Sequence, residues 1–122
     1  DVIDKDVEDN GEGETTVLQQ MQYNNIVPYL VRVRTNELIP IEKTEFFVGK
    51  SPECDYQVVD NKRVSRKHCT FIISNGECYI RDNNSTNHTY VNGKLIQPGF
   101  DVMLGNDDYI RLGDEEFKYW VR

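Results

Sequence analysis

Basic and hydroxyl side chains gather in one short segment of this 122-residue chain. Residues 61–68 read NKRVSRKH, so four cations surround Ser65. Residues 82–89 read DNNSTNHT and supply a run of hydroxyl and amide groups, and Lys50 adds a further cation at the end of an apolar run. Cations beside hydroxyl and amide donors can hold a phosphate group through charge-assisted hydrogen bonds. The sequence therefore predicts an anionic ligand.

Charge is distributed unevenly along the chain. Residues 1–24 hold seven acidic residues and one basic residue, a net charge of -6, whereas the remaining 98 residues hold 14 acidic and 13 basic residues, a net charge of -1. A pI of about 4.8 is not typical of nucleic-acid-binding proteins, which need a positively charged face. We therefore expect no nucleic-acid partner.

The apolar runs and the cysteines indicate the class of protein. No run approaches the roughly 18 apolar residues of a membrane helix, so we expect a soluble protein without a membrane partner. Cys54, Cys69 and Cys78 are odd in number and show no Cys-x-x-Cys spacing. This pattern favours neither a disulfide framework nor a zinc site, and it indicates a reducing cytoplasm with no metal or cofactor.

The chain divides into a tail and a domain. Residues 1–24 are rich in acidic residues, Gly, Asn and Gln and show no sustained hydrophobic period, which predicts a flexible acidic tail or linker. Residues 25–122 form the predicted domain. The first residue is Asp1 rather than methionine, which indicates a piece of a longer protein.

The domain is predicted to be all-β, a sandwich or barrel, because eleven short apolar or β-branched runs alternate with turn residues and no helical stripe reaches ten residues. Asn75-Gly76 and Asn92-Gly93 each lie between two such runs and predict tight hairpins. Pro40 lacks a backbone donor, so its strand should lie at a sheet edge. Trp120 lies in the last run, and we expect it to pack in the core. The predicted strands are 29–34, 38–42, 46–49, 56–59, 68–74, 77–82, 89–91, 94–96, 101–104, 109–112 and 115–121.

Ser65, His68 and Asp82 have the residue types of a hydrolase triad. A serine nucleophile also needs an oxyanion hole, and the chain has no Gly-x-Ser-x-Gly motif. We therefore expect no catalytic residue and no enzyme activity.

Three motifs, in this order and spacing, resemble the forkhead-associated (FHA) domain over roughly residues 28–122. The resemblance implies an eleven-strand FHA-type β-sandwich whose loops at one end bind phosphothreonine peptides. The motifs are Phe47-Val48-Gly49-Lys50, then Ser65-x-x-His68, then Asp82-x-x-Ser85-Thr86-Asn87-x-Thr89-x-Val91-Asn92-Gly93.

The resemblance also implies roles for single residues. Lys50 stands where the family has a phosphate-contacting arginine, and Ser65 matches the serine whose hydroxyl bonds a phosphate oxygen. Arg63 matches a position that in some members contacts the phosphate or the residue three places beyond the phosphothreonine. Arg66 follows Ser65 where other members often have Asn or another polar residue. Thr86 and Asn87 match the pair that lines the threonine methyl pocket and bonds the peptide backbone.

Two matched positions are structural in the family, and a third departs from its pattern. Gly49 and His68 are expected to support the binding loops. His88 stands where most members have glycine. A non-glycine residue with positive φ is strained unless it is hydrogen-bonded locally, so His88 leaves the geometry of this turn open.

The tail resembles a regulatory segment of some bacterial relatives. Glu14-Thr15-Thr16 is similar to the segment ahead of the domain in self-regulated bacterial FHA proteins, where a Ser/Thr protein kinase modifies one threonine and the domain binds its own tail. Thirteen residues separate Thr16 from Tyr29. Extended, they reach about 43–47 Å, more than the 25–32 Å or so expected across the domain. Phosphorylation at Thr15 or Thr16 could therefore lead to autoinhibition.

Two functions follow from these observations. The first is a phosphothreonine-dependent protein-binding module, a signalling adaptor that docks a kinase-modified partner or its own tail. The alternative is a phosphate-independent scaffold for protein–protein interaction, because Lys50 and His88 both depart from the family pattern.

Overall fold

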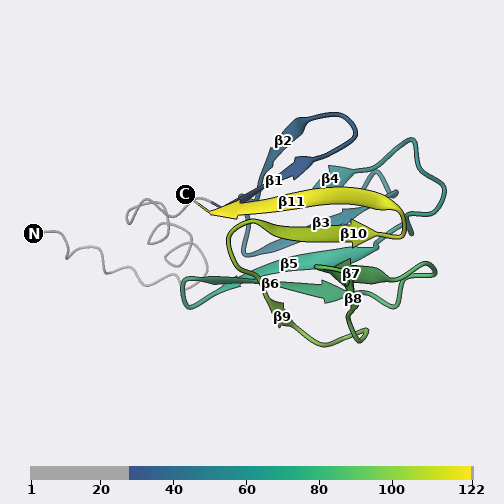
Figure 1. Ribbon diagram of the computed structural model, residues 1–122. Coiled ribbons are helices and arrows are strands. Elements are labelled where there is room, and N and C mark those ends of the chain that lie inside the picture. The colour runs from purple at the N-terminus through teal and green to yellow at the C-terminus, as the bar shows by residue number, and fades with distance from the viewer. Residues whose placement is uncertain (1–27, 122) are drawn as a thin grey trace, which may run out of the picture.

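Eleven β-strands make up residues 28–121, the part of the chain that the computed structural model describes (Figure 1). Residues 1–27, which include the whole predicted tail with Thr15 and Thr16, lie outside it, as does Arg122. Residues 28–121 contain no helix, and so none that could cross a membrane. The strands are β1 Pro28–Arg32, β2 Glu37–Pro40, β3 Glu45–Gly49, β4 Tyr56–Gln57, β5 Cys69–Ser74, β6 Glu77–Asp82, β7 Thr89–Val91, β8 Lys94–Leu95, β9 Val102–Met103, β10 Asp108–Leu112 and β11 Glu115–Val121.

The strands form two sheets that face each other as a sandwich. One sheet has the order β2-β1-β11-β10-β7-β8 and the other has the order β4-β3-β5-β6-β9. The predicted all-β fold and its strand count are confirmed, with strand bounds within two residues of the predicted ones. Pro40 ends β2, an edge strand, so its missing backbone donor costs the sheet no central hydrogen bond.

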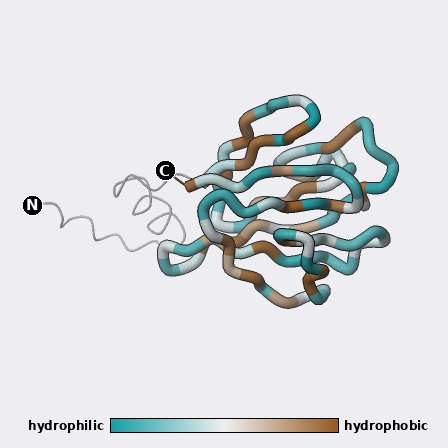
Figure 2. The backbone as a smooth tube through the Cα atoms, in the orientation of Figure 1, coloured by the Kyte–Doolittle hydropathy of each residue, from teal (hydrophilic) through white to brown (hydrophobic). Residues whose placement is uncertain are grey.

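The core lies between the sheets. Buried positions alternate with less buried ones along β1, β6 and β11, and most of the buried residues are apolar. Figure 2 shows the hydrophobic residues interspersed with hydrophilic ones along the backbone. The bulkiest of the fully buried apolar side chains are Tyr119, Phe71, Phe117, Leu30, Ile80 and Ile110. The prediction for Trp120 was wrong. It follows the inward-facing Tyr119 and therefore points outward, where its half-buried ring lies 5.8 Å from Lys118 Nζ.

Both Asn-Gly dipeptides form tight turns. Asn75 and Gly76 have φ values of 53° and 79° between β5 and β6, and Asn92 and Gly93 have φ values of 52° and 83° between β7 and β8. Positive φ at both central residues is the requirement of a type I′ turn, so the two predicted hairpins are confirmed.

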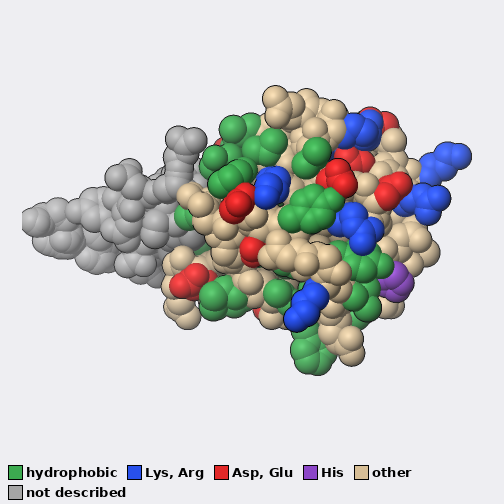
Figure 3. Space-filling model, in the orientation of Figure 1, with side chains coloured by type: hydrophobic (Ala, Val, Ile, Leu, Met, Phe, Trp, Pro, Cys, Tyr) green, Lys and Arg blue, Asp and Glu red, His purple; other side chains and the backbone are tan. Residues whose placement is uncertain are grey.

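Four loops meet at one end of the sandwich, because the parallel strands β3 and β4 both end there, and β6 and β10 also end there before their antiparallel neighbours begin. They connect β3 with β4, β4 with β5, β6 with β7, and β10 with β11, and backbone hydrogen bonds or side-chain contacts join each to another of the four. Lys and Arg side chains gather at the right-hand end of the surface in Figure 3. This end of the molecule positions the predicted site.

Candidate functional site

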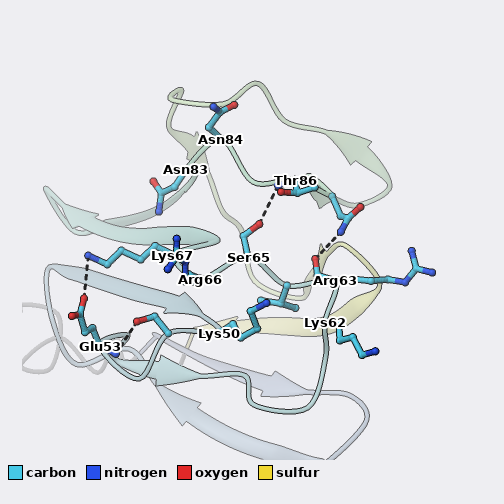
Figure 4. A pocket seen from close by; sticks show the side chains of 13 residues that line it. Lys50, Glu53, Lys62, Arg63, Ser65, Arg66, Lys67, Asn83, Asn84 and Thr86 are labelled. Atoms are coloured by element: carbon cyan, nitrogen blue, oxygen red, sulfur yellow. Dashed lines mark hydrogen bonds and ion pairs between the residues drawn. The ribbon is translucent and has the colours of Figure 1, made fainter.

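A groove of about 760 Å³ opens among these loops (Figure 4). All six residues predicted to bind a ligand line it, although they come from three separate loops. The tertiary structure therefore brings the predicted set together. The lining residues are Lys50, Ser51, Glu53, Lys62, Arg63, Val64, Ser65, Arg66, Lys67, Asn83, Asn84, Thr86 and Asn87.

Gly49 lets the first two loops touch. A Cβ atom at this position would lie 2.1 Å from the carbonyl oxygen of Arg66, closer than any real side chain can approach. The absence of a side chain allows the Lys50 amide to donate to the Ser65 carbonyl at 2.9 Å and the Ser51 amide to donate to the Arg66 carbonyl at 3.0 Å. Gly49 therefore positions the backbone of both loops and has no side chain to present to a ligand.

Ser65 lies at the middle of the groove with its side chain already oriented. The backbone amide of Thr86 donates to Ser65 Oγ at 3.0 Å, which joins the second loop to the third (Figure 4). Because Oγ accepts this bond, the hydroxyl proton of Ser65 can be donated to a ligand. The backbone amide of Ser65 in turn donates to His68 Nδ1 at 3.0 Å.

His68 is fully buried and connects two of the loops from beneath. Its Nδ1 accepts from Ser65, so its Nε2 carries the proton and donates to the carbonyl oxygen of His88 at 2.9 Å. Burial lowers the pKa of His68 below its ordinary value of 6.5. His68 therefore stays neutral at pH 7 and acts as a bridge between backbones.

His88 adopts the conformation that usually belongs to glycine. Its φ is 71°, and its carbonyl oxygen accepts hydrogen bonds both from His68 Nε2 and from the amide of Gly113 at 2.9 Å. Two hydrogen bonds at the same carbonyl oppose the strain of a positive φ. The turn forms with histidine at this position, while the His88 side chain stays exposed.

Asp82 serves the third loop and is not part of a catalytic relay. It accepts hydrogen bonds from the hydroxyls of Ser85 and Thr89, each at 2.6 Å, and from the Ser85 amide at 3.0 Å. Burial alone would raise the pKa of Asp82, but these hydrogen bonds outweigh it and the pKa lies below its ordinary value. Since His68 bonds the backbone of Ser65 and not its hydroxyl, the three residues do not form a triad.

Arg63 contributes its backbone to the groove more than its side chain. Its carbonyl oxygen accepts from Asn87 Nδ2 at 3.0 Å, which fixes the Asn87 side chain. The Arg63 guanidinium points away from Ser65 (Figure 4), and its Nε lies 3.5 Å from Asp114. The structure therefore places the predicted residue at the groove with its charge directed outward.

Asn61 anchors the basic loop, the β4–β5 connection that carries Lys62, Arg63, Arg66 and Lys67, and no sequence motif indicated this role. Its Oδ1 accepts from the Arg63 amide at 2.9 Å, and its Nδ2 donates to Asp114 and to Glu115, both at 2.8 Å. Glu115 begins β11, a central strand of its sheet. The carbonyl and amide groups of the Asn61 side chain therefore join the basic loop to that strand.

Beneath Asn61 lies a buried ion pair. Arg32 Nε donates to Glu115 Oε2 at 2.6 Å, and the two side chains are 4% and 1% exposed. Burial alone would raise the pKa of Glu115, but hydrogen bonds from Arg32, Asn61 and Arg34 lower it below the ordinary value. Both groups therefore stay charged. No local motif could indicate this pair, because 83 residues separate its members.

Within residues 28–121, no group of three or more His, Cys, Asp or Glu side chains lies close enough to hold a metal ion. The groove instead offers cations, a hydroxyl and amide groups, which are donors suited to an anion.

A model of the FHA domain family matches residues 46–113, more than half of the chain and all of the loops that line the groove. The chain belongs to the FHA domain family. It is 34% identical, over 59% of its length, to the E3 ubiquitin-protein ligase rnf8 of Danio rerio. The match covers only 16% of that ligase, so the FHA chain corresponds to a small part of a much longer relative.

Solved structures share the fold of this FHA domain. Mycobacterium tuberculosis EmbR in complex with a low-affinity phosphopeptide matches with a TM-score of 0.73 and 22% identity, over 87% of this chain and 29% of that one. The N-terminal FHA domain of S. cerevisiae Rad53p in complex with a phosphothreonine peptide matches with a TM-score of 0.70 and 19% identity, over 80% of this chain and 94% of that one.

Proposed function

We propose that this FHA domain is a phosphothreonine-dependent protein-binding module, a signalling adaptor with no catalytic step of its own. The observation that carries the proposal is the convergence of Lys50, Ser65, Arg66 and Asn87 on one groove from three separate loops. A phosphothreonine brings about -1.5 to -2 charges and three acceptor oxygens. The cations and the hydroxyl of the groove match these acceptors.

The geometry supports a role for each group. The Ser65 hydroxyl, fixed by the Thr86 amide, donates to a phosphate oxygen. Lys50 and Arg66 have no side-chain partner among residues 28–121, so both are available to the same phosphate. Asn87 Nδ2 is occupied by the Arg63 carbonyl, which leaves Oδ1 to accept from the peptide backbone, and Thr86 lines the groove beside the threonine methyl group.

The size of the effect follows from hydrogen bonds to a charged group, which are worth roughly 1.5–3 kcal/mol each. Three or four such bonds, less the cost of ordering the peptide, give an affinity of roughly micromolar. A Ser/Thr protein kinase must supply the modified residue, because the domain recognises the product of that reaction.

Calorimetry with a peptide of residues 10–22 tests the proposal. We expect binding when Thr15 or Thr16 is phosphorylated and none that is measurable when neither is. The Ser65→Ala substitution should weaken binding of the phosphorylated peptide and leave the unmodified peptide unaffected. Equal affinity for modified and unmodified peptides would contradict phosphate dependence and support the scaffold.

We also propose that the domain binds its own tail after phosphorylation. Pro28 pairs with Val121 at the far end of β11 from Glu115, so the tail begins about 20 Å from the groove end of that strand. The 12 residues from Thr16 to Pro28 reach about 40 Å. A tether of this length gives an effective concentration on the order of millimolar, well above a micromolar dissociation constant.

Amide NMR spectra of the phosphorylated chain test the contact with the tail. We expect shifts at residue 50, at residues 63–68 and at residues 84–88 that do not depend on protein concentration. The Thr15→Ala, Thr16→Ala double variant should show none. Absence of these shifts in the phosphorylated wild type would contradict self-binding without affecting the proposal for peptides.

A further inference from the structure

The charge that lines the groove exceeds that of a single phosphate. Five basic residues line it (Lys50, Lys62, Arg63, Arg66 and Lys67), with the guanidinium of Arg63 directed outward (Figure 4), against one carboxylate, Glu53, so the lining residues carry a formal net charge of +4. One phosphothreonine supplies about -1.5 to -2. About half of the positive charge would then remain uncompensated in the complex.

The carboxylates near the groove neutralise this charge only weakly. Lys67 Nζ lies 3.7 Å from Glu53, and Arg63 Nε lies 3.5 Å from Asp114. All four side chains are more than half exposed, and such pairs contribute little in water. The side chain of Lys62 has no partner at all among the described residues. A ligand can therefore engage these cations without displacing a strong internal pair.

The cations extend beyond the phosphate position in two directions. Arg66 and Lys67 lie on one side of Ser65, and Lys62 and Arg63 lie on the other (Figure 4). A groove of about 760 Å³ has the size of sites that enclose ligands larger than one phosphate group. The positive charge thus extends along the groove on both sides of Ser65 (Figure 4).

We propose that the preferred ligand is an acidic phosphothreonine segment, in which further negative groups beside the phosphothreonine bring its charge to about -4. This inference rests on the proposed function and adds the class of ligand. The shared chemistry is negative charge next to the phosphothreonine, from carboxylates or from a second phosphate. Lys62 and Lys67 are the residues that bind this additional negative charge.

The chain carries one segment of this composition. Glu12 and Glu14 precede Thr15, so phosphorylation of Thr15 gives about -4 over four residues. Phosphorylation of Thr16 as well adds a second phosphate. A peptide of residues 10–20 therefore provides natural probes for both sources of charge.

Fluorescence anisotropy with the unphosphorylated full chain tests the inference. The probes are the 10–20 peptide phosphorylated at Thr15, the same peptide with Glu12→Gln and Glu14→Gln, the peptide phosphorylated at both threonines, and the unmodified peptide. At 50 mM salt we expect the two glutamines to weaken binding by about 2- to 30-fold, the effect of two exposed ion pairs. At 500 mM salt the dissociation constants of the glutamine peptide and the acidic peptide should become nearly equal, so that their ratio approaches one.

Variants of the chain assign the effect to residues. In the Lys62→Ala, Lys67→Ala double variant the ratio between the acidic and the neutral phosphopeptide should approach one. Lys94→Ala, an exposed lysine on β8 outside the groove, is the matched control and should leave the ratio unchanged. If the doubly phosphorylated peptide gains affinity and the glutamates add none, the second phosphate is the source of the charge.

Three outcomes separate the two proposals. Equal binding of the neutral, the acidic and the doubly phosphorylated peptide would overturn the inference and leave the proposed function intact. An affinity ratio between the acidic and the neutral phosphopeptide that persists in the double variant would also overturn it, because Lys62 and Lys67 would not bind the additional charge. If no phosphorylated peptide binds better than the unmodified one, the proposed function itself fails.

Discussion

Two groups of charged side chains lie close together, one at the groove and one beneath the basic loop. They differ in whether their members form ion pairs. At the groove, Lys50, Lys62 and Arg66 are exposed and have no side-chain partner among residues 28–121. Beneath the basic loop, Arg32 and Glu115 are almost fully buried and bonded to each other at 2.6 Å. Asn61 joins the two groups, since it bonds both the Arg63 amide and Glu115.

The difference follows from the cost of desolvation. A buried charge must be paired, because an isolated ion inside a protein costs several kcal/mol. An exposed cation keeps its water until a ligand replaces it. The buried pair can therefore position the loop, and the groove can keep its cations for an anion. The same residue types carry out two tasks, and depth below the surface decides which.

The largest expected effect is on the buried pair. Glu115→Ala leaves Arg32 with only the half-exposed Asp60 at 2.7 Å and the Tyr56 hydroxyl as partners. The free energy of unfolding, measured by urea denaturation, should therefore fall by about 3 kcal/mol, the lower end of the range for a broken buried pair. Lys62→Ala at the groove should change it by less than about 0.5 kcal/mol. An Arg32→Met, Glu115→Leu double variant, which removes both charges, should recover most of the loss. Equal losses for Glu115→Ala and Lys62→Ala would refute the comparison.

The second effect concerns ligand binding. Ser65→Ala removes the hydroxyl at the middle of the groove, and the affinity for a phosphothreonine peptide should fall by about 10- to 100-fold, measured by calorimetry. Ser74→Ala, at the exposed end of β5, is the control and should leave affinity unchanged. A Ser65→Ala variant that binds as tightly as the wild type would show that the phosphate lies elsewhere.

The third effect tests the connection between the two groups. Asn61→Ala leaves the Arg63 amide without its acceptor and Glu115 with one donor fewer. We expect a loss of about 1–2 kcal/mol in the free energy of unfolding and a several-fold loss of phosphopeptide affinity, although Asn61 does not line the groove. Unchanged affinity in a destabilised variant would restrict Asn61 to the buried group.

The smallest effect is a pH dependence centred on His68. Because burial lowers the pKa of His68 below 6.5, the unfolded state takes up this proton first as the pH falls. Stability should be full above pH 6.5 and decline below it, by at most about 1.4 kcal/mol per pH unit. Urea denaturation between pH 7.5 and 5.5 measures the slope. It should be flatter in His68→Asn, and an identical slope would contradict the assignment.

Much of the fold could be predicted from local sequence. Period-2 alternation and Asn-Gly turns identified the eleven strands, because side-chain direction along a strand and positive φ in a turn are properties of neighbouring residues. Trp120 shows the limit of this reasoning. A strand has two faces, and an aromatic side chain alone does not reveal which of them is covered.

The site was predicted in part for the same reason. The resemblance of three motifs to the FHA domain named the six predicted binding residues, and the structure places them around one groove, while their binding roles stay predictions. The resemblance could not show that Arg63 directs its guanidinium outward or that Asn61 anchors the loop. These features depend on Asp114 and Glu115, more than 50 residues away along the chain.

The sequence by itself determined the strands, the tight turns and the supply of cations and hydroxyls, because each of these depends on residue type and on neighbours in the chain. Tertiary structure decided which charges are paired and which are free. Burial and distance between remote residues set the strength of an ion pair, and both exist only after the two sheets have packed.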